Sequence, residues 1–179
     1  MLYHPSAYVP SQAALAANNM QFWPSDSNDY RGFISTRQTG EAKGTIIIFH
    51  GNAGTAADRA HYVSVLTHLG YRVILAEYPG YGGRTGELTE ASFVRDAKET
   101  VRLASETYGA PIFILGESLG CGVAAAAAKD SVVKIDGIIL ITPWDTLLSV
   151  AKEKVDWLPV RLLLRDTYYY SELFYRQTI

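Results

Sequence analysis

The chain has 179 residues, of which 48% are hydrophobic, and its formal net charge at pH 7 is −2. This length predicts a single domain over residues 1–179, because a chain of this size buries about 70% of its unfolded surface. The charges are scattered without a basic stripe, which excludes a nucleic-acid-binding surface of the usual kind.

The cysteine content and the N-terminal sequence indicate which cellular compartment to expect for the protein. The single cysteine, Cys121, excludes an internal disulfide framework and a cysteine-rich metal site. The N-terminus has no leader pattern, and the uncharged runs are shorter than the roughly 20 apolar residues of a membrane span. We therefore expect a soluble, cytoplasmic protein without a transmembrane segment.

The first part of the chain predicts an arm and a hairpin. Residues 1–19 lack periodicity, so an irregular arm is expected. Residues 20–23, which Pro24 ends, and residues 29–36 predict two strands paired with each other.

From residue 45 onward, apolar strand-like runs alternate with helical patterns. Strands are expected over residues 45–50, 71–78, 111–115 and 135–141, and helices over residues 56–69, 89–108, 119–129 and 146–154. The strands are continuous apolar runs, which is typical of strands buried on both faces. This alternation predicts an α/β fold, a three-layer α/β/α sandwich around a mostly parallel sheet.

Two of the expected helices have an apolar stripe that predicts their inward face. The stripes consist of Ala60, Val63, Leu66 and Leu69 in the first helix, and of Phe93, Ala97, Val101 and Ala104 in the second.

The segment Gly116-Glu117-Ser118-Leu119-Gly120 lies between an expected strand and an alanine-rich helix. In that context G-x-S-x-G is typical of a nucleophile elbow, in which a strained turn presents the serine hydroxyl. The two glycines allow the strand and the helix to approach closely. The pattern predicts Ser118 as a nucleophile; the alternative is an ordinary turn with an incidental serine.

Acyl transfer at a serine also needs donors for the developing oxyanion. The N–H of Leu119 directly follows the serine. A second N–H is expected from the loop His50-Gly51-Asn52-Ala53-Gly54, where Gly51 lets the backbone approach a substrate and the N–H of Asn52 points at it. Both loops follow adjacent parallel strands, where ligands bind in open α/β sheets. The alternative is a plain tight turn.

These motifs, with Tyr78-Pro79-Gly80-Tyr81-Gly82 between them, resemble the α/β-hydrolase fold. Within that fold they are similar to the serine hydrolases that include acyl-protein depalmitoylases and lysophospholipid lipases. The resemblance covers nearly the whole chain. It implies that Ser118 is the nucleophile and that Asn52 and Leu119 are the oxyanion donors, but it does not choose a substrate. The serine and the two oxyanion loops favour a small acyl ester as the substrate.

The chain departs from the family in its histidines. In this fold the triad runs Ser, then Asp or Glu, then His. All four histidines here, at positions 4, 50, 61 and 68, precede Ser118. The chain is therefore expected to lack the last strands of the fold, together with the acid and the histidine. A natural loss, a cloning boundary and a frameshift are all open explanations.

Two residues could take the place of the missing triad acid and histidine, and each also has a purely structural interpretation. Asp145 follows an expected strand, where some members of the fold carry their acid, but a helix N-cap is the favoured interpretation. His50 begins the oxyanion loop, and with Gly51 it is expected to support that loop rather than to act as a base. Cys121 is expected to be a small buried residue.

No cofactor or metal is expected. The segment 80–86 does not fit G-x-G-x-x-G, and the segment 51–55 lacks the G-K-[ST] ending of a phosphate loop.

Two hypotheses remain open. The first is a serine-dependent hydrolase of carboxylic esters or thioesters that is weak or inactive without a triad histidine. The second is a catalytically silent chain that forms homo-oligomers, through the sheet edge at residues 135–141 or through the segment 158–170.

Overall fold

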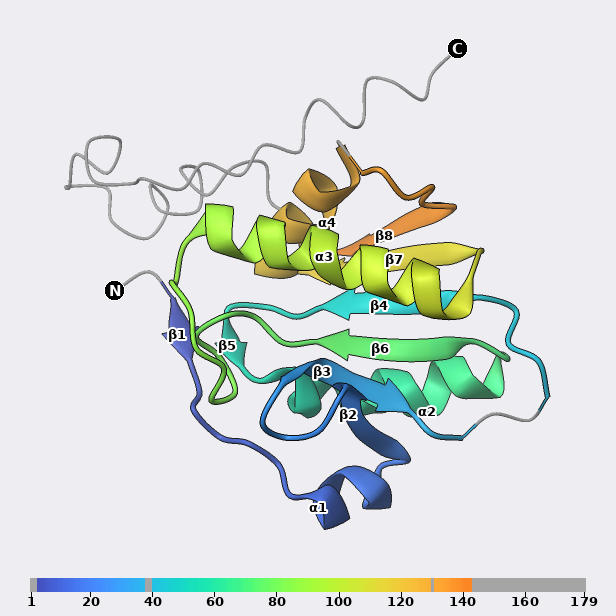
Figure 1. Ribbon diagram of the computed structural model, residues 1–179, viewed down its shortest axis with the longest axis horizontal. Coiled ribbons are helices and arrows are strands. Elements are labelled where there is room, and N and C mark those ends of the chain that lie inside the picture. Colours follow the sequence, from blue (N-terminus) through green and yellow to red (C-terminus); the bar gives the residue numbers. More distant parts are fainter. Residues whose placement is uncertain (1–2, 38–39, 130, 143–179) are drawn as a thin grey trace.

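The centre of the structure is a sheet in the order β2-β3-β6-β4-β7-β8 (Figure 1). The computed structural model describes residues 3–37, 40–129 and 131–142. The strands of this sheet are β2 (Met20–Pro24), β3 (Tyr30–Ser35), β4 (Thr45–Phe49), β6 (Arg72–Ala76), β7 (Ile112–Glu117) and β8 (Gly137–Ile141). The strands β6, β4, β7 and β8 are parallel to one another, whereas β3 is antiparallel to both of its neighbours, β6 and its hairpin partner β2. The predicted hairpin and mostly parallel sheet are confirmed.

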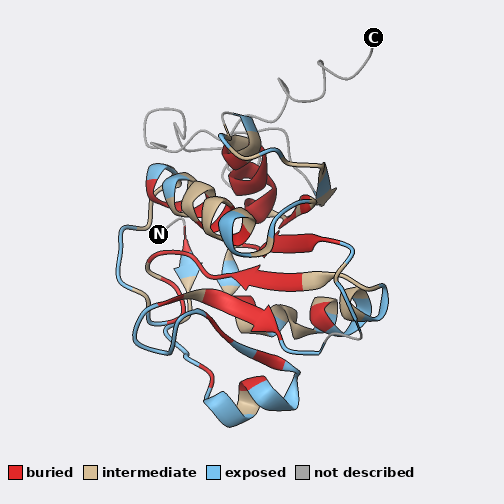
Figure 2. Ribbon diagram, turned by 45° about the vertical axis from the view of Figure 1, so that its right-hand side comes forward, coloured by how far each residue is buried: buried red, intermediate tan, exposed pale blue. Residues whose placement is uncertain are grey.

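Helices cover both faces of the sheet and complete the predicted three layers. On one face lie α3 (Glu90–Tyr108) and α4 (Leu119–Lys129); on the other lies α2 (Ala60–His68), preceded by the 3-10 turn η1 (Ala56–Arg59). Alternate residues of β4 point to opposite faces, as the pleat requires: Ile47 and Phe49 join one core cluster, and Ile46 and Ile48 join the other. Figure 2 shows that most of the buried residues lie in the strands and in α4.

The helix α3 follows directly from its sequence. Thr89 caps its N-terminus by accepting a hydrogen bond from the N–H of Ser92, and Gly109 ends it with a φ of 72°. All four residues of its predicted stripe are buried, at 0–2% exposure. The stripe therefore holds α3 on the sheet, while its polar residues face outward.

The structure corrects three details of the prediction. Residues 1–19 are not irregular throughout: they include the short helix α1 (Gln12–Ala17), in which the Ser11 hydroxyl accepts from Ala14 N–H. The first turn of the expected helix 56–69 is the 3-10 turn η1. Leu69 does not pack on the sheet but is 54% exposed, because it follows the last residue of α2.

Two short strands connect the N-terminal arm to the loop after β4. They are β1 (His4–Pro5) and β5 (Ala53–Gly54), which pair in parallel. The expected helix 146–154, the residue Asp145 and the segment 158–170 lie outside the described residues.

Candidate active site

Ser118 lies in the turn between β7 and α4, and its backbone is strained. Its φ is 51°, in the left-handed region that residues with a side chain rarely adopt. Its N–H donates to the carbonyl of Ile141 at 3.0 Å, and its carbonyl accepts from the N–H of Cys121 at 2.9 Å. The Ser118 side chain is half-buried, and no described residue forms a hydrogen bond with its hydroxyl.

The two glycines that flank this turn are required by close packing. A Cβ on Gly116 would lie 2.6 Å from the Cα of Cys121 and would overlap the carbonyl of Gly120. A Cβ on Gly120 would overlap the carbonyl group of Phe49, at the end of β4. The elbow is therefore pressed directly against the neighbouring strand, and only glycine fits at either position.

The loop after β4 lies beside the elbow, as expected for adjacent parallel strands. Phe49 is paired with Gly116, so both strands end at the same level. The position of a Cβ on Gly51 is 3.6 Å from the carbonyl oxygen of Glu117, the residue before Ser118. The structure thus brings Ser118 and Leu119 of one loop together with Gly51 and Asn52 of the other.

Asn52 is held by groups from two other segments. Its Oδ1 accepts from the backbone N–H of His4 at 3.2 Å and from the Tyr81 hydroxyl at 3.0 Å. The Tyr81 hydroxyl is also 2.9 Å from the Asn52 carbonyl oxygen, to which it can donate instead. The N-terminal arm and the loop after β6 therefore both support this part of the chain.

His50 and Glu77 form a buried pair beneath the same loop. The imidazole Nε2 is 2.8 Å from Glu77 Oε1, Nδ1 is 2.7 Å from the Gly51 carbonyl, and both side chains are at most 1% exposed. Glu77 Oε2 also accepts from the N–H of Ala56 at 2.9 Å. With both ring nitrogens engaged and no exposed surface, His50 is poorly placed to take a proton from a serine.

A second ion pair lies between the two loops. Arg59 donates two hydrogen bonds to the Glu117 carboxylate, from Nε at 3.3 Å and Nη2 at 3.0 Å, and a third from Nη1 to the Ala53 carbonyl at 3.1 Å. The side chains are 15% and 25% exposed. This pair joins the residue before Ser118 to the residue after Asn52.

The other three histidines are not part of a buried network. The His4 residue is exposed on β1, His61 is exposed and stacks on Tyr62 with ring centroids 4.2 Å apart, and His68 contacts the carbonyl of Ser64 within its own helix. His61 and His68 are therefore surface residues.

Three further residues of this region, Glu77, Tyr81 and Arg59, were not predicted from the sequence as site residues. Glu77 had a signal that could have been used, since it is the one carboxylate within the apolar run 71–78. Such a residue in a buried strand needs a partner. Arg59 had no such signal, because a helix-forming segment commonly carries exposed arginines.

Burial raises the pKa of three groups near the site. Desolvation raises the pKa of Tyr81 to about 12, and that of Tyr30, which donates to the Gly82 carbonyl, to about 12 as well. Burial raises the pKa of the Cys121 thiol to about 11. Cys121 is completely buried, as predicted, so its thiol is shielded from solvent.

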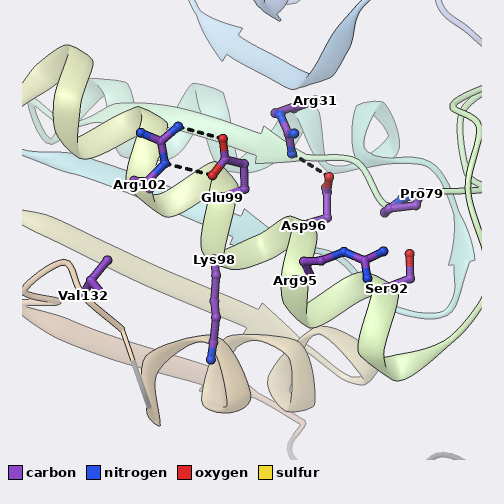
Figure 3. Close-up of a pocket in the computed structure, with 9 residues that line it drawn as sticks. All are labelled: Arg31, Pro79, Ser92, Arg95, Asp96, Lys98, Glu99, Arg102 and Val132. Carbon is purple, nitrogen blue, oxygen red and sulfur yellow. Dashed lines mark hydrogen bonds and ion pairs between the residues drawn. The ribbon is translucent and has the colours of Figure 1, made fainter.

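A separate hollow of about 450 Å³ lies on the outer side of α3 (Figure 3). Its lining includes Arg31, Asp96, Glu99 and Arg102, and none of the predicted site residues. Figure 3 shows Arg31 paired with Asp96 and Arg102 paired with Glu99. The distance from Arg31 Nη1 to Asp96 Oδ1 is 2.6 Å. The lining contains four basic side chains, Arg31, Arg95, Lys98 and Arg102, and two carboxylates, Asp96 and Glu99, so the hollow is basic.

Among the described residues, no three His, Cys, Asp or Glu side chains are grouped so that they could hold a metal ion. None of the helices in the part of the chain that the structure covers is both long and apolar enough to cross a membrane.

Comparison with known proteins identifies the fold. The model of the family described as "Serine aminopeptidase, S33" matches residues 40–163. The structure superposes on a thermostable carboxyl esterase from Bacillus coagulans with a TM-score of 0.58 at 17% identity, over 77% of this chain and 50% of that one. A monoacylglycerol lipase of Paleococcus ferrophilus gives a TM-score of 0.51 at 18% identity, over 69% and 50%. The predicted α/β-hydrolase fold is confirmed.

Two relatives are similar in sequence. An uncharacterised protein of Mycobacterium tuberculosis is 32% identical over 174 residues, which are 94% of this chain and 61% of the relative. The lysophosphatidylserine lipase ABHD12 of Danio rerio is 34% identical over 113 residues, 60% of this chain and 30% of the lipase. The chain thus spans less than two thirds of the length of either relative.

Proposed function

Because this chain belongs to the S33 serine aminopeptidase family of α/β-hydrolase proteins, we propose that it is a serine-dependent hydrolase of carboxylic esters or thioesters. In this proposal Ser118 is the nucleophile, and the backbone N–H groups of Asn52 and Leu119 stabilise the oxyanion. The names of two similar proteins, a lysophosphatidylserine lipase and a carboxyl esterase, support the choice of an ester as substrate.

One observation carries the proposal: the strained backbone of Ser118 at the turn between β7 and α4. A φ of 51° at a serine is retained only where the surrounding structure imposes it, and such positions cluster at functional sites. The turn also lies beside the Gly51–Asn52 loop at the carboxyl ends of two parallel strands, where open α/β sheets bind ligands.

The chemistry follows from this arrangement. The Ser118 oxygen bonds to the acyl carbon while solvent water takes its proton, and the carbonyl oxygen becomes an oxyanion. The C=O bond then re-forms, the C–O or C–S bond to the leaving group breaks, and the alcohol or thiol leaves after it takes up a proton from water. Water then hydrolyses the acyl-serine ester and releases the acid. Oxyanion donors are commonly the largest single source of rate in such sites.

Turnover by these 179 residues alone is expected to be slow, because none of their four histidines follows Ser118. Serine hydrolases from which triad residues are removed retain roughly 10³–10⁴-fold catalysis over water, from binding and oxyanion stabilisation. Asp145 could supply an acid, although a helix cap is the favoured role for it. We propose no metal or cofactor for the reaction.

The test combines covalent labelling with turnover. A fluorophosphonate probe is expected to label the protein at Ser118, and p-nitrophenyl acetate turnover is expected to fall to background in Ser118→Ala. Ser64→Ala is the matched control, since Ser64 is exposed on α2, and it should behave as the unaltered protein. If Ser118 is not labelled and Ser118→Ala turns over the ester at the original rate, the proposal is wrong.

A second candidate function is a catalytically silent chain that self-associates. The observation that favours it is at β8, which is one of the two edge strands of the described sheet and where Ile138 and Ile139 are 38% and 46% exposed. Apolar side chains on an edge strand favour pairing with another chain. Light scattering is expected to report a dimer or larger species, and Ile139→Lys to shift it toward monomer. A monomer at micromolar concentration would contradict this candidate.

A further inference from the structure

The guanidinium of Arg59 connects the two loops of the proposed site. Arg59 is the last residue of η1, outside both loops. Its fork binds both carboxylate oxygens of Glu117, and its remaining amine donates to the carbonyl of Ala53. Glu117 directly precedes Ser118, and Ala53 directly follows Asn52. This one side chain therefore contributes to holding the proposed nucleophile and the proposed oxyanion donor at a fixed distance.

The Arg59–Glu117 pair also determines the net charge next to the position of the proposed oxyanion. Glu117 Oε1 is 3.5 Å, and Arg59 Nη2 3.4 Å, from the point that a Cβ on Gly51 would occupy. Both groups thus border the Gly51–Asn52 peptide. A carboxylate alone would repel a developing oxyanion, whereas the guanidinium opposite it cancels that charge. Both side chains are only partly exposed, so water screens the interaction incompletely.

We propose that Arg59 is a positioning residue for ester hydrolysis: it clamps the oxyanion loop to the elbow and neutralises Glu117. This inference rests on the proposed function of Ser118. Lysine cannot replace arginine here, because a single ammonium cannot bind both carboxylate oxygens in a fork and reach the Ala53 carbonyl as well.

The experiment separates the electrostatic role from a merely structural one. Arg59→Met leaves Glu117 unneutralised, and we expect kcat to fall by about 10-fold or more with KM little changed. The rate of fluorophosphonate labelling should fall in parallel. In Arg59→Met/Glu117→Gln the negative charge is gone, so about a third or more of the lost rate should return on a logarithmic scale.

Glu117→Gln by itself is not expected to lower kcat, in contrast to Arg59→Met. It keeps a hydrogen-bonding partner for Arg59 and removes the negative charge, so kcat is expected to stay equal or to rise. A purely structural clamp would give no gain of rate in Glu117→Gln and the same loss in Arg59→Met as in the double variant. Glu117→Gln changes little volume, so it tests the inference even if Arg59→Met does not fold, as thermal melting would report.

Arg102→Met is the matched control. Arg102 binds Glu99 through the same two-pronged geometry, with bonds of 2.9 and 2.8 Å, but on the outer face of α3. The kcat of Arg102→Met should therefore equal that of the unaltered protein.

The outcomes distinguish the two proposals. If Ser118→Ala abolishes labelling while Arg59→Met labels and turns over as the unaltered protein does, the role of Arg59 is overturned and that of Ser118 is supported. Equal kcat losses in Arg59→Met and in the double variant would overturn charge neutralisation. If Ser118→Ala changes nothing, the proposed function fails and the inference fails with it.

Discussion

Gly120, at the start of α4, is in direct contact with the carbonyl group of Phe49, at the end of β4. A Cβ on Gly120 would lie 2.6 Å from the Phe49 carbonyl carbon and 2.8 Å from the carbonyl oxygen of His50. All of these neighbours are backbone atoms of a central strand and of the residue that follows it, and they cannot move away singly. This contact sets how closely the elbow approaches the loop that carries Asn52.

We predict that Gly120→Ala destabilises the protein by about 2–4 kcal/mol, since overpacking against fixed backbone costs about 1–3 kcal/mol and the elbow strand must also shift. Gly137→Ala is the control, because there the nearest atom is a ring carbon of Phe113 at 3.0 Å, in a side chain that can turn. Urea denaturation of the two variants checks the difference. Equal stabilities would contradict the packing argument.

Glu77→Ala is expected to reduce stability by about 3–5 kcal/mol, because it leaves the buried His50 ring and the Ala56 N–H without their partner. Glu77→Gln should lose less, since an amide oxygen can still accept. The control is Glu106→Ala, whose side chain is 58% exposed in a surface pair with Arg102 and should cost less than about 0.5 kcal/mol. Guanidinium denaturation measures the difference in unfolding free energy, with the same slope against denaturant concentration for each variant. A loss of stability in Glu77→Ala no larger than in Glu106→Ala would refute the role of Glu77 as a buried partner.

Phe93→Ala should cost about 3–5 kcal/mol, the usual loss for a fully buried aromatic residue. Phe93 has no exposed surface and stacks on Tyr78 with ring centroids 4.9 Å apart. Val65→Ala, on the exposed side of α2 at 59% exposure, should change stability by less than about 0.5 kcal/mol. Thermal melting of both variants gives the comparison, and similar melting temperatures would show that α3 is not packed as described.

Alkaline pH is expected to destabilise the fold through Tyr81. Burial raises its pKa from 10.0 to about 12, so the folded phenol keeps its proton while the unfolded phenol ionises between these values. The unfolded state then binds fewer protons, and stability falls as pH rises through that interval, whereas below it Tyr81 makes no pH-dependent contribution.

Tyr81→Phe tests this sign. The variant loses hydrogen bonds to Asn52 at all pH values, so at neutral pH it should be less stable by about 1 kcal/mol. Its stability should then decline less steeply than that of the unaltered protein between about pH 9 and about pH 11. Urea midpoints at these two pH values measure both effects, and parallel declines would exclude Tyr81 as a source.

The N-terminal arm shows where local patterns were insufficient. The helix α1 has six residues, too few for a clear apolar period, and it forms because Ser11 caps it and Leu15, at 1% exposure, is buried. The pairing of His4 and Pro5 with Ala53 and Gly54 joins segments about 50 residues apart, and no local signal marks it. In contrast, the apolar stripe of α3 and the hairpin formed by β2 and β3 were predictable. Each depends on residues close together in the chain, and the spacing of the apolar residues shows which of them lie on one face.

The sequence by itself determined the alternation of strands and helices, the α/β-hydrolase fold, and the turn that contains Ser118, because glycine spacing and apolar periodicity act over a few residues. Only the tertiary structure decided which charged groups meet around that turn. Glu77 pairs with His50, and Arg59 with Glu117, across 27 and 58 positions of the chain. Such pairs depend on how strands are ordered in the sheet and on where each loop ends, and no spacing along the chain encodes that.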